Sequence, residues 1–378
     1  MVLLCLAIGP SGRMHAQESW ALGSPTFSVG DADAPEYQFY NVEAALIYDG
    51  SLYVADRGSA QVRAYDLASG ELLAVAGGQG MGPGEFRWLG WLGQCGNTPE
   101  LVTFDPVQQR ISIFSRDLEH LRTLRLDHSS WLRWVRCAGP DALVGAYTIG
   151  TDYPSVIGPY RTPVELAIFA LSDGSRTRTV GTFPGEDRYF DGSNDGPQTW
   201  GKAPVVASLP NGFLFGTSDK WSLTIHDPTG SVVDSLALDQ PRVPVLATEI
   251  AEYHDRMLEA WRQAGRPPQW LDATRQAYER YVYPSHYPAF SEVVTSETGY
   301  VWVRTYPSPV RQSPAHWIVF SPTGDVVANA ELPHAFSLMW VADDGVVGVS
   351  VDALGVEQVE WRPIRRRAQR VPTPRRSG

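Results

Sequence analysis

The chain has 378 residues, 43% of them hydrophobic, and its formal net charge is −11. This charge argues against nonspecific binding of DNA or RNA, which needs lysine and arginine to displace counterions from the phosphates. Trp, Tyr and Phe are frequent (13, 16 and 13), as are Gly (35) and Pro (29). Aromatic residues suit stacked β-sheets, and frequent Gly and Pro are typical of many short strands joined by turns.

The first residues predict export. Residues 2–8 form a short apolar run, residues 9–12 break it, and Ala16 stands where a signal peptidase could cleave. This pattern is typical of the end of a secretory signal peptide, although the basic segment before the apolar run is missing. We therefore expect residues 1–16 to be a signal peptide and the mature protein to be periplasmic or secreted by a bacterium. No later apolar run is long enough to span a bilayer.

Two cysteines, Cys95 and Cys137, follow the predicted signal peptide. Each ends an apolar stretch just before a turn, so the two are expected at equivalent places in neighbouring repeats. In an exported chain such a pair suggests one disulfide, and two isolated buried thiols are the alternative. Metal binding is not expected from two sulfurs with no histidine nearby.

A four-strand unit recurs along the chain. In its clearest copy, strands are expected at residues 42–48, 52–55, 62–65 and 72–76, and Asp49-Gly50 forms the first hairpin turn. In the five later units the second and third strands are expected at 101–104 and 111–114, 143–146 and 164–170, 213–215 and 222–226, 301–303 and 317–320, and 346–350 and 356–361.

The last unit lacks its fourth strand, whereas residues 25–29 form a spare strand before the first unit. If the spare strand fills the gap, the ring of units closes and its sheet edges are no longer exposed. We therefore predict an all-β, six-bladed β-propeller over residues 17–364 that is closed by its N-terminal strand. Residues 365–378, which are rich in arginine, are expected to form a solvated basic tail, with binding of an anionic surface as the alternative.

One helical insert interrupts the repeats at residues 240–288, between the fourth and fifth blades. Thr248 is expected to cap a helix that carries Tyr253, Leu258 and Trp261 on one face, and Gly265 and the prolines after it end this helix. A second helix is expected at about residues 270–281.

The first unit also resembles a known group of proteins. Its Leu52-Tyr53-Val54-Ala55-Asp56 stretch and the later Gly82-Pro83-Gly84-Glu85-Phe86 element resemble the NHL-type repeats of bacterial six-bladed propeller proteins. The resemblance implies the fold and export. It implies little about function, because function depends on the site rather than on the fold.

Every long connection is expected on one face of the propeller, where each second strand ends and each first strand begins. These connections are residues 147–163, 184–201, 240–288 and 305–314. Long connections on a rigid scaffold commonly form binding sites. Six residues on this face are the predicted ligand-binding residues: Arg57, Arg133, Tyr147, Lys220, Arg304 and Tyr306. The four basic residues could bind a small anion at the mouth of the central channel. In the alternative, Asp56, Asp105 and Asp352 cap turns and the arginines pair with them.

No catalytic residues are predicted, because the sequence contains no nucleophile elbow, phosphate-binding loop or His-Glu-x-x-His motif. No cofactor is predicted either. The run from Asp191 to Gly196 resembles a Ca²⁺ loop but lacks the later bidentate glutamate, which favours a polar turn. We expect a monomeric, non-catalytic propeller that recognises a protein, peptide or glycan. The alternative is a metal-assisted lyase or lactonase, which would require three or more carboxylate or histidine groups to converge at the channel mouth.

Overall fold

The computed structural model describes residues 18–30, 34, 37–128, 130–150, 154–307, 310 and 314–368. The predicted signal peptide (1–16) and residues 369–378 of the predicted tail lie outside these ranges. No helix in the described ranges is long and apolar enough to cross a membrane.

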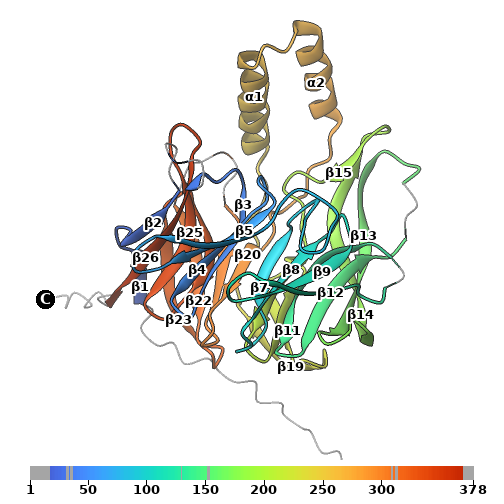
Figure 1. Cartoon of the computed structure of the whole chain (residues 1–378). Coiled ribbons are helices and arrows are strands. Elements are labelled where there is room, and N and C mark those ends of the chain that lie inside the picture. Colours follow the sequence, from blue (N-terminus) through green and yellow to red (C-terminus); the bar gives the residue numbers. More distant parts are fainter. Residues whose placement is uncertain are drawn as a thin grey trace, which may run out of the picture.

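The fold is all-β apart from one helical insert and is built from successive antiparallel meanders (Figure 1). The first three are β3 (Val42–Tyr48), β4 (Ser51–Asp56), β5 (Gln61–Asp66) and β6 (Leu72–Gly77); β7 (Trp91–Gln94), β8 (Glu100–Asp105), β9 (Arg110–Ser115) and β10 (His120–Leu124); and β11 (Leu132–Gly139), β12 (Ala142–Thr148), β13 (Gly158–Ala170), β14 (Arg176–Phe190) and β15 (Asp195–Pro197). The others are β16 (Val205–Leu209), β17 (Gly212–Gly216), β18 (Ser222–His226) and β19 (Val232–Ala237); β20 (Phe290–Thr295), β21 (Val301–Thr305), β22 (Ala315–Phe320) and β23 (Val326–Leu332); and β24 (Phe336–Val341), β25 (Gly345–Val351) and β26 (Glu357–Ala368).

The N-terminal strands join the last two meanders into one nine-stranded sheet, so the described chain has five hydrogen-bonded sheets. Strand β1 (Glu18–Leu22) lies parallel to β23 and antiparallel to β26. Strand β2 (Phe27–Val29) pairs antiparallel with β26, which is the pairing that the sequence predicted for the spare strand. Strand β1 was not predicted.

The first strands of the meanders form a closed ring. Each of β3, β7, β11, β16, β20 and β24 contacts the next, and β24 contacts β3. Neighbouring sheets bury their faces against each other, and as a result β8, for example, buries all its residues from Leu101 to Asp105. A continuous apolar run is what a strand covered on both faces requires. The fold is therefore propeller-like.

A disulfide joins Cys95 and Cys137, whose Cα atoms are 5.2 Å apart. Both side chains are buried, one just after β7 and the other near the end of β11. The predicted disulfide is confirmed, and the alternative of two free thiols is wrong. The bond ties together two neighbouring strands of the inner ring.

Two helices, α1 (Ala247–Gln263) and α2 (Pro268–Arg280), stand above the body of the molecule between β19 and β20 (Figure 1). Leu258 and Leu271 are their buried residues, and Trp261 and Trp270 meet edge to face with ring centroids 5.5 Å apart. The prediction of Thr248 as the cap is wrong, because the helix begins at Ala247 and Leu246, two residues before Thr248, takes the cap position.

Two predicted loops are largely strand. Residues 158–163 and 184–190, expected in long connections, pair as the outer part of the β13–β14 hairpin, and β15 adds a further strand. Strand β26 also continues through Ala368, so Arg365, Arg366 and Arg367 pair with β1 and do not belong to a free tail. Strand β26 gains a partner that is distant in sequence, whereas β13, β14 and β15 pair with their neighbours along the chain.

Candidate functional site

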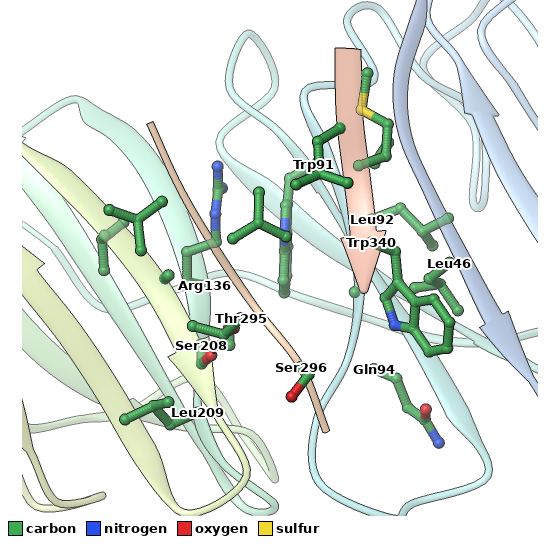
Figure 2. Close-up of a pocket in the computed structure, with 18 of the residues that line it drawn as sticks. Leu46, Trp91, Leu92, Gln94, Arg136, Ser208, Leu209, Thr295, Ser296 and Trp340 are labelled. Atoms are coloured by element: carbon green, nitrogen blue, oxygen red, sulfur yellow. Dashed lines mark hydrogen bonds between the residues drawn. The ribbon is translucent and has the colours of Figure 1, made fainter. Parts of the chain in front are cut away.

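The ring encloses a cavity of about 500 Å³ that is lined by residues from all six first strands (Figure 2). Leu46, Leu92 and Trp340 lie on one side of this channel, with Ser208 and Leu209 on the other. The channel walls are mainly apolar. This composition is typical of small-molecule sites, which combine apolar walls with a few placed polar groups.

Three charged residues of the first strands also line the channel: Glu43, Arg136 and Glu292. The Arg57 guanidinium lies 2.6 Å from the Glu43 carboxylate, and that of Arg304 lies 3.1 Å from Glu292. Burial raises the pKa of both glutamates, and the paired arginines oppose this rise. Each glutamate therefore has its own arginine partner.

Arg136 differs from these paired residues. It donates one hydrogen bond to the carbonyl of Val135 (2.8 Å), and its guanidinium lies 5.6 Å from the centre of the Trp91 ring. Burial lowers its pKa to about 10, and the charge of Glu43 opposes this change. Sequence reasoning missed Arg136, although its alternation with Trp134 in an otherwise apolar strand could have placed both on the channel face.

The six predicted ligand-binding residues do not form one cluster. Arg57 and Arg304 bind the channel glutamates, as described above. Arg133 lies 3.4 Å from Glu186, Tyr147 is buried and donates a hydrogen bond to Glu165, and Lys220 is exposed. Tyr306 stacks on Tyr287, with ring centroids 5.5 Å apart. Whether any of them binds a ligand stays a prediction.

The predicted turn caps are present, but the arginines pair elsewhere. Asp56 accepts hydrogen bonds from the backbone of Tyr40 and Asn41, and Asp105 from Arg87 and Trp88. Asp352 accepts bonds from the amides of residues 354 and 356. Within the described ranges, no group of three or more His, Cys, Asp or Glu residues is arranged to hold a metal ion. The metal-assisted alternative therefore has no ligand set in that part of the chain.

The acidic run at Asp191–Gly196 is the turn between β14 and β15. The Asp191 carboxylate accepts hydrogen bonds from the amides of Ser193 and Asn194. Asp195 pairs with Arg188 and accepts a hydrogen bond from Tyr160. These contacts stabilise the turn.

The glycine-rich element between β6 and β7 has a structural role. Phe86 is fully buried and lies 6.2 Å from the Phe114 ring, in the core between the first two meanders. Arg110 donates hydrogen bonds to the carbonyls of Met81, Gly82 and Glu85. The element therefore packs the first two units together.

We call the side of the ring that carries α1 and α2 the upper face. An aromatic cluster at the base of the insert centres on Trp200, which contacts Tyr253, Tyr283 and Tyr287 with centroid distances of 4.8–5.4 Å. Trp200 has φ +59°, a left-handed conformation that a bulky residue holds only when packing requires it. His254 lies 2.9 Å from the Tyr283 hydroxyl. This packing fixes the insert to the ring.

A second cavity, of about 370 Å³, lies between the insert and the β13–β15 extension. Arg161 pairs with Asp187 (3.2 Å) and Asp219 (2.8 Å), and Lys202 pairs with Asp187 (2.9 Å). Tyr189, near the end of β14, stacks on Tyr281 with ring centroids 4.0 Å apart. These contacts hold the strand extension against the insert.

Comparisons with known proteins address the fold. No protein-family model matches the sequence, and no curated protein matches it. A member of the DUF4221 family from Bacteroides vulgatus has a similar structure, with TM-score 0.54, 8% identity and coverage of 94% of this chain and 100% of that one. A protein of Bacteroides fragilis described as a candidate exported protein has TM-score 0.51, 11% identity and coverage of 92% and 95%. Identities this low show the fold alone.

The structure also resembles the Cps50 (Swd1) β-propeller domain of Myceliophteria thermophila, with TM-score 0.43, 11% identity and coverage of 89% of this chain and 98% of that one. A TM-score this low carries no argument about the fold, which rests on the ring of strands described above. The resemblance to NHL-type repeats is not tested by these comparisons and stays a prediction.

Proposed function

We propose that the chain is an exported, monomeric, six-bladed β-propeller with NHL-like repeats that binds a protein, peptide or glycan through its upper face and catalyses no reaction. The closed ring of six first strands supports the blade count. In this interpretation the nine-stranded sheet contains the fifth and sixth blades, and β1 and β2 join them.

The distribution of exposed apolar side chains carries the proposal. All but five of the large hydrophobic residues found exposed in the described ranges lie in connections of the upper face or at the strand end beside them. They include Tyr40, Met81, Trp88, Trp131, Ile157, Val243 and Leu354. The other five lie on the outer strands: Leu73, Val75, Leu121, Val232 and Val233. Exposed apolar surface gathered on one side favours an interaction site there.

The same face carries the larger structural additions. The α1–α2 insert and the outer part of the β13–β14 hairpin both rise there, and the Tyr189–Tyr281 stack joins them. Tyr, Trp and Arg are the residues enriched where proteins bind partners. Export is supported by the disulfide, because such bonds persist in oxidising compartments.

The test is binding of the mature protein to peptide and glycan arrays. We expect capture of at least one ligand class, and we expect the Trp88→Ser/Trp131→Ser variant to lose it by about tenfold or more, since interface aromatics often contribute 2 kcal/mol or more. The Leu73→Ser/Leu121→Ser variant is the matched control, because it removes exposed apolar residues from outer strands. Equal loss in the control, or metal-dependent turnover of a lactone or uronate polymer, would contradict the proposal.

A further inference from the structure

Arg136 is the unmatched charge of the channel. It projects from β11, in the middle of the inner ring, and lines the cavity together with Trp91 and Trp134. Among the residues that the structure describes, no carboxylate oxygen lies within 4.0 Å of its guanidinium nitrogens. Its single hydrogen bond to Val135 leaves most of the five N–H donors of the guanidinium unused.

The charge of Glu43 acts on Arg136, but Glu43 forms its ion pair with Arg57. Glu292 is bound by Arg304. Glu297, which also lines the cavity, is exposed in the turn after β20. Pairing the two inner glutamates with their own arginines leaves one positive charge in the channel.

Arg136 is half-buried and has one hydrogen bond and the Trp91 ring as its contacts, whereas a bidentate guanidinium–carboxylate pair is among the strongest polar contacts in proteins. We propose that the channel binds a small organic carboxylate, whose anionic group pairs with Arg136 and whose apolar part lies along the wall formed by Leu46, Leu92 and Trp340. The cavity of about 500 Å³ suits a small molecule and not a polymer. The single unmatched charge favours a monocarboxylate.

This site is independent of the proposed upper-face function. A partner at the upper face would contact the exposed connections, whereas the carboxylate would lie inside the ring. Array binding tests the upper face and carboxylate titration tests the channel, so either measurement can fail while the other succeeds. The two proposals therefore fail separately.

Calorimetric titration of the mature protein tests the channel site, with hexanoate and benzoate as probes and hexanamide and benzamide as neutral analogues. We expect the protein to bind a carboxylate and not the matching amide. Arg136→Gln should weaken carboxylate binding about 10- to 100-fold, the range expected for lost hydrogen bonds to a charged group. Arg122→Gln is the matched control, because Arg122 lies on the outer strand β10 and pairs with Glu100 (2.6 Å), and it should leave the affinity unchanged.

Three results would overturn the proposal: no binding of either carboxylate, equal binding of the amides, or unchanged affinity in Arg136→Gln. Full competition by chloride at equal concentration would also overturn it, since it would show an inorganic anion site. If Arg136→Gln fails to fold, Arg136→Lys replaces it. Lysine keeps the charge but lacks the planar fork, so carboxylate binding should still weaken by about tenfold.

Discussion

The bond between Cys95 and Cys137 closes a loop with a sequence separation of 42 residues, and reducing it should lower stability measurably. For a loop of this length, the chain-entropy relation gives a loss of about 4 kcal/mol at 25 °C. The unfolding entropy expected for 378 residues converts this loss into a fall of about 5 °C in the unfolding midpoint.

Thermal unfolding of the oxidised and fully reduced protein, followed by circular dichroism, measures the difference. Alkylation and mass analysis confirm how many thiols are free in each sample. The Cys95→Ala/Cys137→Ala variant is the control and should unfold at the same temperature with and without reductant. Identical midpoints for the oxidised and reduced native protein would show that the bond does not stabilise the fold, and free thiols in the unreduced sample would show that it does not form.

Three further predictions concern the fold. Gly212→Ala should lower the free energy of unfolding, measured by chemical denaturation, by about 2 kcal/mol or more beyond the loss in Gly78→Ala. The reason is that a Cβ at Gly212 would lie 2.0 Å from the His226 carbonyl oxygen, whereas a Cβ at Gly78 meets nothing within 4 Å. Equal losses in the two variants would show that only backbone strain matters. Deleting residues 1–30 removes β1 and β2 and should lower the unfolding midpoint, and an unchanged midpoint would contradict closure by these strands. Burial lowers the pKa of His226 below 6.5, so its contribution to stability is complete above that pH and declines as the pH falls toward the folded-state value. His226→Phe should therefore flatten the loss of stability between about pH 7.5 and 5.5, and an unchanged slope would exclude this histidine as a cause.

Local sequence patterns predicted most of the meander strands. The turn at Asp49-Gly50 and the apolar runs around it gave β3, β4 and β5 with boundaries within a residue or two. Such patterns are informative because each central strand is buried on both faces and each turn needs residues that accept unusual backbone angles. The pairing of β2 followed from counting the strands that lacked a partner.

Pairing over long sequence distances could not be read in this way. Strand β1 pairs with β23 and β26, more than 300 residues away, and its five residues show no pattern that identifies those partners. The β13–β14 hairpin continues beyond the ring because its two strands and β15 satisfy each other's backbone groups. Their composition had predicted that residues 158–163 and 184–190 belong to loops.

The channel charges show the same limit. The sequence placed Arg57 and Arg304 at the mouth, but their partners Glu43 and Glu292 lie on the preceding strands and received no role. Arg136 was overlooked because it was counted within an apolar stretch. Which charge is paired and which is not depends on side-chain distances, and these become visible only in the folded ring.

We propose that the upper face is the binding face. Hydrogen exchange, measured by mass spectrometry with and without a ligand captured on the arrays, tests it most directly. We predict that bound ligand slows exchange in residues 78–90, 184–201 and 240–288, which belong to the upper connections. Protection confined to the turns of the opposite face, such as residues 67–71 and 171–175, would show that the ligand binds elsewhere than the upper face.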